Sequence, residues 1–340
     1  MYSSHEQPSI SAGAGWDPLQ AVRLGGSAVN VGRFGLGTAF VGIAAAQGRA
    51  DEALDAIRAA LRAGVRYFDT APLYGLGHAE RLLGQALAGQ TRGSFTVSTK
   101  VGRHPATDAG GKQVSVFDFS AAATMRSLEQ SLARLQLDRV DIVLVHDPDD
   151  HYHEALTGAY PVLQRLRSEG VVGAIGVGVN DASLAARVIR DADPDCVLVA
   201  GRYTLLDQRA ADEVLPLCAE RGVAVLAGGV FNGGILAAPR PGAWYDYVPA
   251  PLEVLRRARR LQRLCARHGV PLRAAALQFP LGHRAVASVV CGCQRPEEVE
   301  DTLDMFKVPV PSEFWQDLIS EGLLSAADPL PGSPGALRGD

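Results

Sequence analysis

The chain has 340 residues, of which 47% are hydrophobic, and its formal net charge at pH 7 is −4. That length can supply one large domain with a substantial core, and the slightly acidic balance argues against nucleic acid or an anionic membrane as the main partner. No apolar run approaches the roughly 20 residues that a membrane-spanning helix needs, and the polar first residues lack the core of a signal peptide. The five cysteines are irregularly spaced, which is typical of a reducing compartment, so we expect a cytoplasmic protein.

Along the chain, a short apolar run alternates repeatedly with a stretch of helical period. A short hairpin is predicted near residues 23–30, before the first of these runs. The predicted strands are 34–38, 65–69, 95–99, 140–145, 172–177, 196–200, 223–227 and 286–290. The predicted helices are 50–63, 78–88, 120–136, 154–169, 181–191, 209–221, 252–268 and 296–306.

Eight units of strand followed by helix predict an α/β fold, a closed (β/α)₈ TIM barrel. The rival doubly wound sheet would need a longer glycine-rich fingerprint than residues 35–39 provide. Two long connections, roughly 101–118 after the third strand and 228–251 after the seventh, have lengths typical of binding loops. One further helix is predicted within 311–324, outside the barrel or over its mouth. We therefore expect a single barrel domain over residues 21–330, between flexible tails at 1–20 and 331–340.

Only three of the 33 basic residues are lysines, which are Lys100, Lys112 and Lys307. Lys100 ends a predicted strand, where an arginine could never lose its proton. Two other predicted strands lead into polar residues, Asp69 and His146, and Tyr74 follows Asp69 by one loop. Because the carboxyl ends of all strands in a parallel barrel meet at one rim, these four residues are predicted to come together there.

The four residue types indicate a tyrosine that exchanges a proton with an alcohol or carbonyl oxygen. A free tyrosine has a pKa near 10, so a nearby lysine cation is needed to favour its phenolate. A carboxylate would hold that lysine, and a histidine would orient the substrate oxygen. Such proton transfer contributes roughly 10²–10⁴-fold in rate. Each residue alone would be interpreted as an ordinary polar group at a strand end, but the set of four predicts an enzyme.

Residues 67–75 (YFDTAPLYG), followed by 80–84 (ERLLG), resemble the signature of the aldo-keto reductase superfamily. Lys100 and residues 145–148 (VHDP) also fall where that family carries its catalytic tetrad. The resemblance extends over residues 23–330 and is closest to the D-threo-aldose 1-dehydrogenase (L-fucose dehydrogenase) branch. The segments that carry the branch resemblance are 146–150, 173–180, 200–208, 271–280 and 314–324.

The resemblance implies that Tyr74 is the proton donor or acceptor, that Lys100 and Asp69 set its pKa, and that His146 orients the substrate. It also implies NAD or NADP as the cofactor. The residues expected beside the cofactor are Gly37, Thr38, Asp69, Asn180, Phe231, Gly292, Arg295 and Glu298. Among them, Asn180 matches the residue that holds the nicotinamide carboxamide.

The choice between the two cofactors depends on the residues after the last strand. Family members strict for NADP often place a lysine or arginine where this chain has Gly292 and Glu298. A carboxylate near the ribose can accept a 2′-hydroxyl hydrogen bond and repels a 2′-phosphate, which favours NAD. Glu298 could instead serve only a helix N-terminus, and Arg295 could bind a phosphate, so use of both cofactors stays open.

The chain departs from the family at two positions. A glutamine is common where this sequence has Ala200. The tyrosine that commonly stacks on the nicotinamide after the seventh strand is replaced within residues 227–232, where Gly228 begins the loop and Phe231 could partly substitute.

The long loop after the seventh strand contains Trp244, Tyr245 and Tyr247. We expect Trp244 and Tyr245, together with Tyr74 and His146, to contact the substrate, although packing elsewhere is an equal alternative for the aromatic residues. Acids on the loop after the fourth strand, Asp147, Asp149 and Asp150, would accept hydrogen bonds from sugar hydroxyls. A small-molecule substrate of the L-fucose, D-arabinose or L-galactose type, oxidised at C1 to the lactone, is favoured.

Two other functions stay open. The same tetrad could serve an NAD(P)-dependent aldehyde or pyridoxal oxidoreductase. The chain could also be a non-catalytic nicotinamide-sensing subunit, although a pure binding protein would not need the whole tetrad. The sequence says nothing about oligomeric state.

Two motifs could suggest other chemistry. Asp147, Asp149, Asp150, His151 and His153 could form a metal cluster, but hydride transfer from a nicotinamide needs no metal, and we interpret them as a solvated acidic loop. Residues 291–293 (CGC) could be a redox pair, but we interpret them as two small residues beside a close backbone contact.

Overall fold

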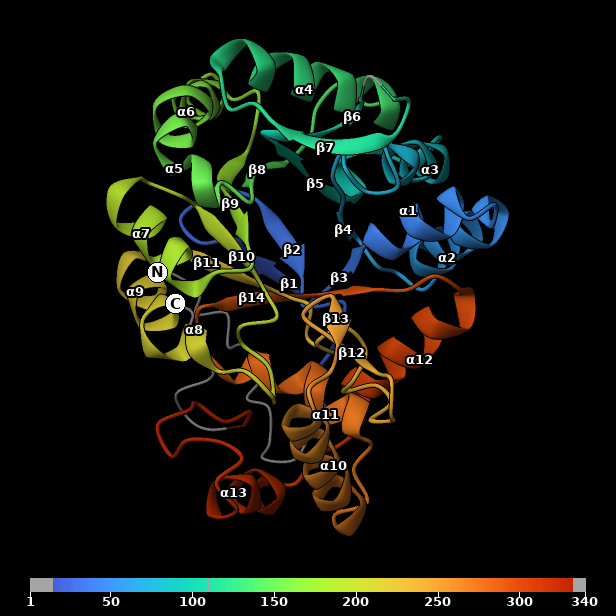
Figure 1. Cartoon of the computed structure of the whole chain (residues 1–340), viewed down its shortest axis with the longest axis vertical. Helices are drawn as coiled ribbons and strands as arrows, with labels where there is room; N and C mark the ends of the chain where they lie inside the picture. Colours follow the sequence, from blue (N-terminus) through green and yellow to red (C-terminus); the bar gives the residue numbers. More distant parts are fainter. Residues whose placement is uncertain (1–14, 109, 333–340) are drawn as a thin grey trace, which may run out of the picture.

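The computed structural model describes residues 15–108 and 110–332 and shows the predicted TIM barrel (Figure 1). Eight parallel strands close into a barrel in the order β3, β4, β5, β8, β9, β10, β11, β14. Their bounds are Phe34–Gly37 (β3), Tyr67–Asp69 (β4), Thr96–Val101 (β5), Ile142–His146 (β8), Ala174–Val179 (β9), Cys196–Ala200 (β10), Ala224–Gly228 (β11) and Val286–Gly292 (β14). Closure by pairing of β14 with β3 excludes the open doubly wound sheet.

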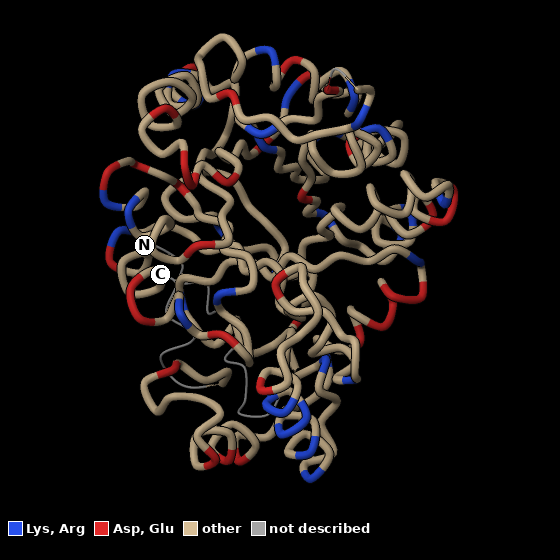
Figure 2. The backbone as a smooth tube through the Cα atoms, in the orientation of Figure 1, with Lys and Arg blue, Asp and Glu red and all other residues tan. Residues whose placement is uncertain are grey.

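The predicted helices form the outer ring. They are α2 (Ala50–Arg62), α3 (His78–Leu87), α4 (Ala121–Leu135), α6 (Tyr160–Ser168), α7 (Ala182–Asp191), α9 (Val214–Arg221), α10 (Leu252–Arg267) and α12 (Pro296–Lys307). The Asp181 carboxylate caps α7 by accepting hydrogen bonds from the backbone of Ser183 and Leu184. Most charged residues lie on these helices and on the loops, away from the barrel strands (Figure 2).

Apolar side chains on the two faces of most barrel strands belong to two separate clusters. One face packs against the helices, and the other fills the barrel interior with residues such as Leu144 and Leu198. The interior cluster also contains Leu24 and Val31 from the predicted hairpin, which is formed by β1 (Ala21–Arg23) and β2 (Asn30–Gly32). A Cβ on Gly25 would lie 2.4 Å from the carbonyl oxygen of Asp195, just before β10. The hairpin therefore covers the amino-terminal end of the barrel and leaves the carboxyl end for a site.

Both long connections contain a hairpin. The one after the third barrel strand forms β6 (Arg103–Thr107) and β7 (Gln113–Phe117), and the one after the seventh forms β12 (Trp244–Tyr245) and β13 (Val248–Pro249). The predicted C-terminal helix is α13 (Ser312–Ser320), which packs on α10 outside the barrel.

Two helices were not predicted, namely α1 (Ala39–Ala46) and α11 (Leu272–Gln278). The remaining short elements are η1 (Arg92–Ser94), η2 (Asp149–His151), α5 (Tyr152–Glu154), the π-helical η3 (Ala155–Ala159), α8 (Arg209–Asp212) and η4 (Phe279–Gly282). The sequence of α1 is almost entirely apolar, yet Phe40 and Ile43 are exposed. Its pattern therefore contains no polar face from which a helix could be predicted.

The packed part of the chain begins before residue 21. Trp16 is only 4% exposed, and its backbone N–H donates to the carbonyl oxygen of Phe306. The rest of the predicted tails, residues 1–14 and 333–340, lies outside the described residues. No helix among those that the structure describes has the length and apolarity to cross a membrane.

Candidate active site

Lys100 and Asp69 form a buried ion pair at the carboxyl end of the barrel. The ammonium Nζ lies 2.9 Å and 2.8 Å from the two carboxylate oxygens of Asp69, and it also donates to the Thr70 carbonyl oxygen at 2.9 Å. The two side chains are 1% and 4% exposed. Burial is the largest single influence and would lower the pKa of Lys100, but the Asp69 carboxylate and the Tyr74 phenol together outweigh it, so the pKa is raised and the lysine keeps its charge.

Neighbouring hydroxyl groups fix the carboxylate and its backbone. Ser98 Oγ donates to Asp69 Oδ1 at 2.7 Å. Thr38, predicted to lie beside the cofactor, is fully buried and bonds the Asp69 carbonyl oxygen through both its backbone N–H (2.8 Å) and its hydroxyl (3.0 Å). Thr38 therefore supports the acid of the tetrad.

Tyr74 is positioned by close backbone packing of its loop on α1. Gly75 has a φ of +56°, and a Cβ there would lie 2.1 Å from the carbonyl oxygen of Gly42. The glycine pair lets the loop lie directly on the helix. The Tyr74 ring centroid is 4.7 Å from Lys100 Nζ and 6.0 Å from the His146 ring, which meets it edge-on. The structure thus brings the four predicted residues together.

The pKa of Tyr74 is raised to about 12. Burial is the largest cause, and Asp69 adds to it, while the Lys100 cation acts in the opposite direction. Lys100 lowers the pKa of the phenol, as expected, but burial has the larger effect. Tyr74 is therefore protonated at neutral pH, ready to donate to a carbonyl oxygen, and must lose its proton before it can act as a base.

His146 is buried and neutral. Burial, with the cations of Lys100 and Arg103, holds its pKa well below the ordinary value. Its Nδ1 has no hydrogen-bond partner among the described residues, whereas Nε2 lies 3.6 Å from Oδ2 of Asp147. A carboxylate beside Nε2 favours the tautomer that carries its proton there, so His146 can donate a hydrogen bond to a substrate oxygen.

The predicted cofactor residues lie on the same rim. Gly37 is paired with Gly292 on one side and with Asp69 on the other. Asn180 follows β9, and its side-chain amide lies 3.4 Å from Asp147 Oδ1. Glu298, in the first turn of α12, accepts hydrogen bonds from the Gln294 backbone and from Arg295.

This set of groups fits a dinucleotide. The Asn180 amide can bond a carboxamide. The loop after β11 has glycines at positive φ, Gly229, Gly233 and Gly234, whose backbone can approach phosphates closely. Arg295, just before α12, is an exposed cation that pairs with Glu298 in the first turn of that helix. Phe231 is half-buried and packs against the core.

The aromatic residues of the β12–β13 hairpin do not all face the tetrad. Tyr245 donates to Asp207 Oδ2 at 3.3 Å and lines a cavity of about 570 Å³ together with Asp207 and His283. Trp244 is largely exposed. Tyr247, at the tip, is close enough to contribute to the raised pKa of Tyr74.

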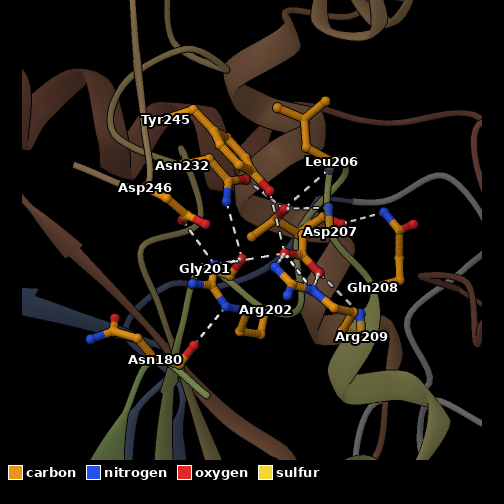
Figure 3. Close-up of polar contacts among 11 residues, drawn as sticks. Asn180, Gly201, Arg202, Leu206, Asp207, Gln208, Arg209, Asn232, Tyr245 and Asp246 are labelled. Carbon is orange, nitrogen blue, oxygen red and sulfur yellow. Dashed lines mark hydrogen bonds and ion pairs between the residues drawn. The ribbon is translucent and has the colours of Figure 1, made fainter. Parts of the chain in front are cut away.

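A polar network holds this hairpin against the loop after β10 (Figure 3). Arg202 pairs with Asp246 at 2.8 Å, and its Nε donates to the carbonyl oxygen of Asn180 at 2.6 Å. Asn232 Nδ2 donates to the Gly201 carbonyl oxygen at 3.1 Å. Arg202 was not predicted as a site residue, and the only signal for it in the sequence is its place in the segment 200–208.

The two motifs that could suggest other chemistry show no sign of it in the described part of the chain. No three or more His, Cys, Asp or Glu side chains there are grouped so that they could hold a metal ion. Cys291 and Cys293 are buried free thiols.

Comparison with known proteins gives one family. Residues 33–320 match the model of the aldo/keto reductase family. The chain is 41% identical over 335 residues to pyridoxal 4-dehydrogenase of Microbacterium luteolum, covering 89% of this chain and 97% of that protein. It is also 41% identical over 292 residues to D-threo-aldose 1-dehydrogenase of Pseudomonas sp, covering 81% and 89%. Among solved structures, the holo form of the aldo-keto reductase AKR11C1 from Bacillus halodurans aligns with a TM-score of 0.75 at 25% identity, covering 90% of this chain and 97% of that one.

Proposed function

The chain belongs to the aldo/keto reductase family of NAD(P)-dependent oxidoreductases, and we propose that it oxidises C1 of a free aldose to the lactone. The observation that carries this proposal is the assembled tetrad, with Tyr74 between the Lys100–Asp69 pair and His146. A nicotinamide-sensing protein would not need all four groups in this arrangement. Sugars of the L-fucose, D-arabinose and L-galactose type are the first candidates, because one of the two relatives at 41% identity is an aldose dehydrogenase.

Each residue of the tetrad has a defined task in this reaction. His146 Nε2–H donates a hydrogen bond to the C1 hydroxyl oxygen and holds it beside the Tyr74 phenol. Tyr74, as phenolate, accepts the hydroxyl proton while the C1 hydride departs, and Lys100 stabilises the phenolate. Asp69 keeps Lys100 charged and fixed. The bound nicotinamide supplies the hydride acceptor.

Pyridoxal is the second candidate substrate, supported by the other relative at 41% identity. Pyridoxal and aldoses share one property, which is a hydroxyl group that can add to the aldehyde of the same molecule. Both therefore form cyclic hemiacetals, and oxidation of a hemiacetal carbon gives a lactone. The same tetrad could serve either compound, so the difference between them depends on the surrounding contacts.

NAD is the proposed cofactor, with NADP use possible. At Gly292 an added Cβ would lie 2.4 Å from the Phe40 ring, so a longer side chain that could bind a 2′-phosphate has no room unless Phe40 moves. Glu298 supplies a negative charge near the same place. The five free thiols support a reducing compartment such as the cytoplasm.

The deciding experiment is a panel of aldoses, pyridoxal and simple aldehydes, assayed with each cofactor by the absorbance of the reduced nicotinamide. We expect NAD reduction with at least one of the named sugars. Turnover of pyridoxal with none of the sugars would establish the second candidate instead. A preference for NADP above about tenfold in kcat/KM, or about 1.4 kcal/mol in transition-state binding, would contradict the cofactor proposal.

A further inference from the structure

Asp147, the residue after His146, has its backbone in a conformation that few residues other than glycine adopt. Its φ is +44°, and its N–H donates to the Gly178 carbonyl oxygen at 3.0 Å, which ties this bend to β9. Successive side chains of a strand normally point to opposite faces. Here the bend brings the carboxylate next to the imidazole, so that Asp147 Oδ2 lies 3.6 Å from His146 Nε2. Strain of this kind often accompanies function.

Among the residues that the structure describes, the Asp147 carboxylate has one strong hydrogen-bond partner. Arg103 Nη1 donates to Oδ2 at 2.6 Å, and the Asn180 amide approaches Oδ1 at a long 3.4 Å. The side chain is 13% exposed. A carboxylate offers about four lone-pair positions, so the carboxylate of Asp147 retains the capacity to accept a further hydrogen bond beside the position where His146 would hold the reacting oxygen.

Arg103 is itself anchored in the β6–β7 hairpin. Its Nε donates to Ser115 Oγ at 2.9 Å, and its guanidinium lies 5.3 Å from the centre of the Phe117 ring. The hairpin therefore presents the arginine, and the arginine fixes the carboxylate. On the other side of the mouth, the Tyr247 phenol is close enough for the Asp147 charge to raise its pKa, although burial is the larger cause.

We propose that Asp147, held by Arg103, is a specificity-determining residue that accepts a hydrogen bond from a second substrate hydroxyl beside the reacting carbon. This inference rests on the proposed function. The acceptor is adjacent to the His146 donor, and the oxygens of two neighbouring carbons are about one hydrogen-bond length apart. In an aldose the second hydroxyl is on C2, and in pyridoxal it is the ring hydroxyl beside the carbon that bears the aldehyde. A plain aldehyde lacks this group and would leave one acceptor position of the half-buried carboxylate unfilled.

The test compares substrate pairs that differ only in that hydroxyl. For the native enzyme, the aldose should exceed its 2-deoxy analogue in kcat/KM by about 10²-fold, since a site built to bond a hydroxyl rejects the analogue that lacks it. In Asp147→Asn, this ratio should fall about tenfold or more, because a hydrogen bond to a charged group is lost. If pyridoxal is the substrate, the pair is pyridoxal and 3-deoxypyridoxal.

Two further variants separate recognition from a merely structural role. Asp147→Glu keeps the charge but moves the carboxylate, and it should also lose the preference. Glu154→Gln removes a negative charge from the segment that follows and should keep the preference. Calorimetry of lactone binding to the enzyme saturated with reduced cofactor should show weaker binding to both Asp147 variants, by about tenfold.

The outcomes distinguish this inference from the proposed function. If neither native substrate class is turned over, the proposed function fails. If the native enzyme oxidises these compounds but Asp147→Asn slows the hydroxylated and deoxy substrates equally, the carboxylate acts only through the Arg103 hairpin, and the specificity proposal is wrong. Should Asp147→Asn fail to fold, the ratio of kcat/KM for the hydroxylated and deoxy substrates in Asp147→Glu tests the specificity proposal instead.

Discussion

Arg202 donates a 2.6 Å hydrogen bond to the carbonyl oxygen of Asn180, the predicted carboxamide contact, from a loop that follows a different strand. The same guanidinium pairs with Asp246 at 2.8 Å and lies 3.6 Å from Asp207. Asp246 and Tyr247 form the two-residue turn of the β12–β13 hairpin, both at positive φ, where asparagine and glycine are the usual residues. The Arg202 side chain thus links the rim of the proposed cofactor site to the β12–β13 hairpin.

We predict that Arg202→Lys weakens binding of the reduced cofactor by about tenfold, since a lysine cannot reproduce the forked geometry. The substrate KM should rise as well, because the hairpin loses its anchor. Cofactor binding is measured by fluorescence titration. Arg209→Lys is the matched control, because Arg209 also pairs with Asp207 but is largely exposed and contacts neither Asn180 nor Asp246. Equal effects of the two variants would contradict a positioning role.

Tyr74→Phe should nearly abolish turnover, because only the hydroxyl that transfers the proton is removed. The expected loss is about 10²-fold or more in kcat. Cofactor affinity, measured in the same titration, should stay close to that of the native protein. A variant that kept more than about a tenth of native kcat would overturn the role of Tyr74.

The raised pKa of Tyr74, about 12, predicts the pH dependence of oxidation. A phenol with an upward-shifted pKa is protonated at neutral pH. The fraction of Tyr74 in the phenolate form, which acts as the base, therefore increases as the pH rises. The kcat/KM for oxidation should therefore increase steadily into the alkaline range, while reduction, which uses the protonated phenol, should stay flat near neutral pH. Lys100→Met removes the cation that lowers this pKa, so the rise of kcat/KM for oxidation should shift to still higher pH. Oxidation that is independent of pH would exclude a phenol of raised pKa as the base.

A half-buried histidine outside the tetrad, His283, predicts part of the acid sensitivity. Burial, with Arg284, lowers the pKa of His283 to about 4. In the unfolded chain this imidazole takes up a proton near pH 6.5, whereas in the folded protein it stays neutral until about pH 4. Its contribution to stability is therefore present above pH 6.5 and is lost as pH falls through that window.

The variant His283→Asn should reduce this loss. Asparagine can still accept from the Ala285 backbone N–H, as Nδ1 of His283 does at 3.1 Å. Urea unfolding between about pH 7 and pH 4 should show a shallower decrease for the variant. Identical slopes for the two proteins would mean that His283 titrates normally in the folded state.

The tetrad could be predicted because it depends on local pattern. Each of Asp69, Lys100 and His146 ends an apolar run, and the barrel brings those ends together. Asp147 was predicted, with Asp149 and Asp150, to accept hydrogen bonds from sugar hydroxyls, but its place beside His146 could not be predicted, because it depends on a backbone φ that the sequence does not reveal. The pairing of Arg103 with Asp147 spans 44 residues, as does that of Arg202 with Asp246. Such long-range contacts depend on how the two hairpins pack against the rim of the barrel. Local sequence periodicity does not predict that packing.

The near-absence of lysine has a practical consequence for attaching this protein to a support. Lys100 is enclosed in its ion pair, so of the three lysines only Lys112 and Lys307 offer amines to a coupling reagent. Lys112 is in the turn of the β6–β7 hairpin, which follows a barrel strand on the catalytic side, whereas Lys307 ends α12, next to the Phe306 carbonyl that Trp16 contacts. A helix that follows a barrel strand runs back toward the amino-terminal end. Replacing Lys112 with arginine would therefore direct lysine coupling to Lys307, leaving the catalytic face of an immobilised enzyme turned toward the solution.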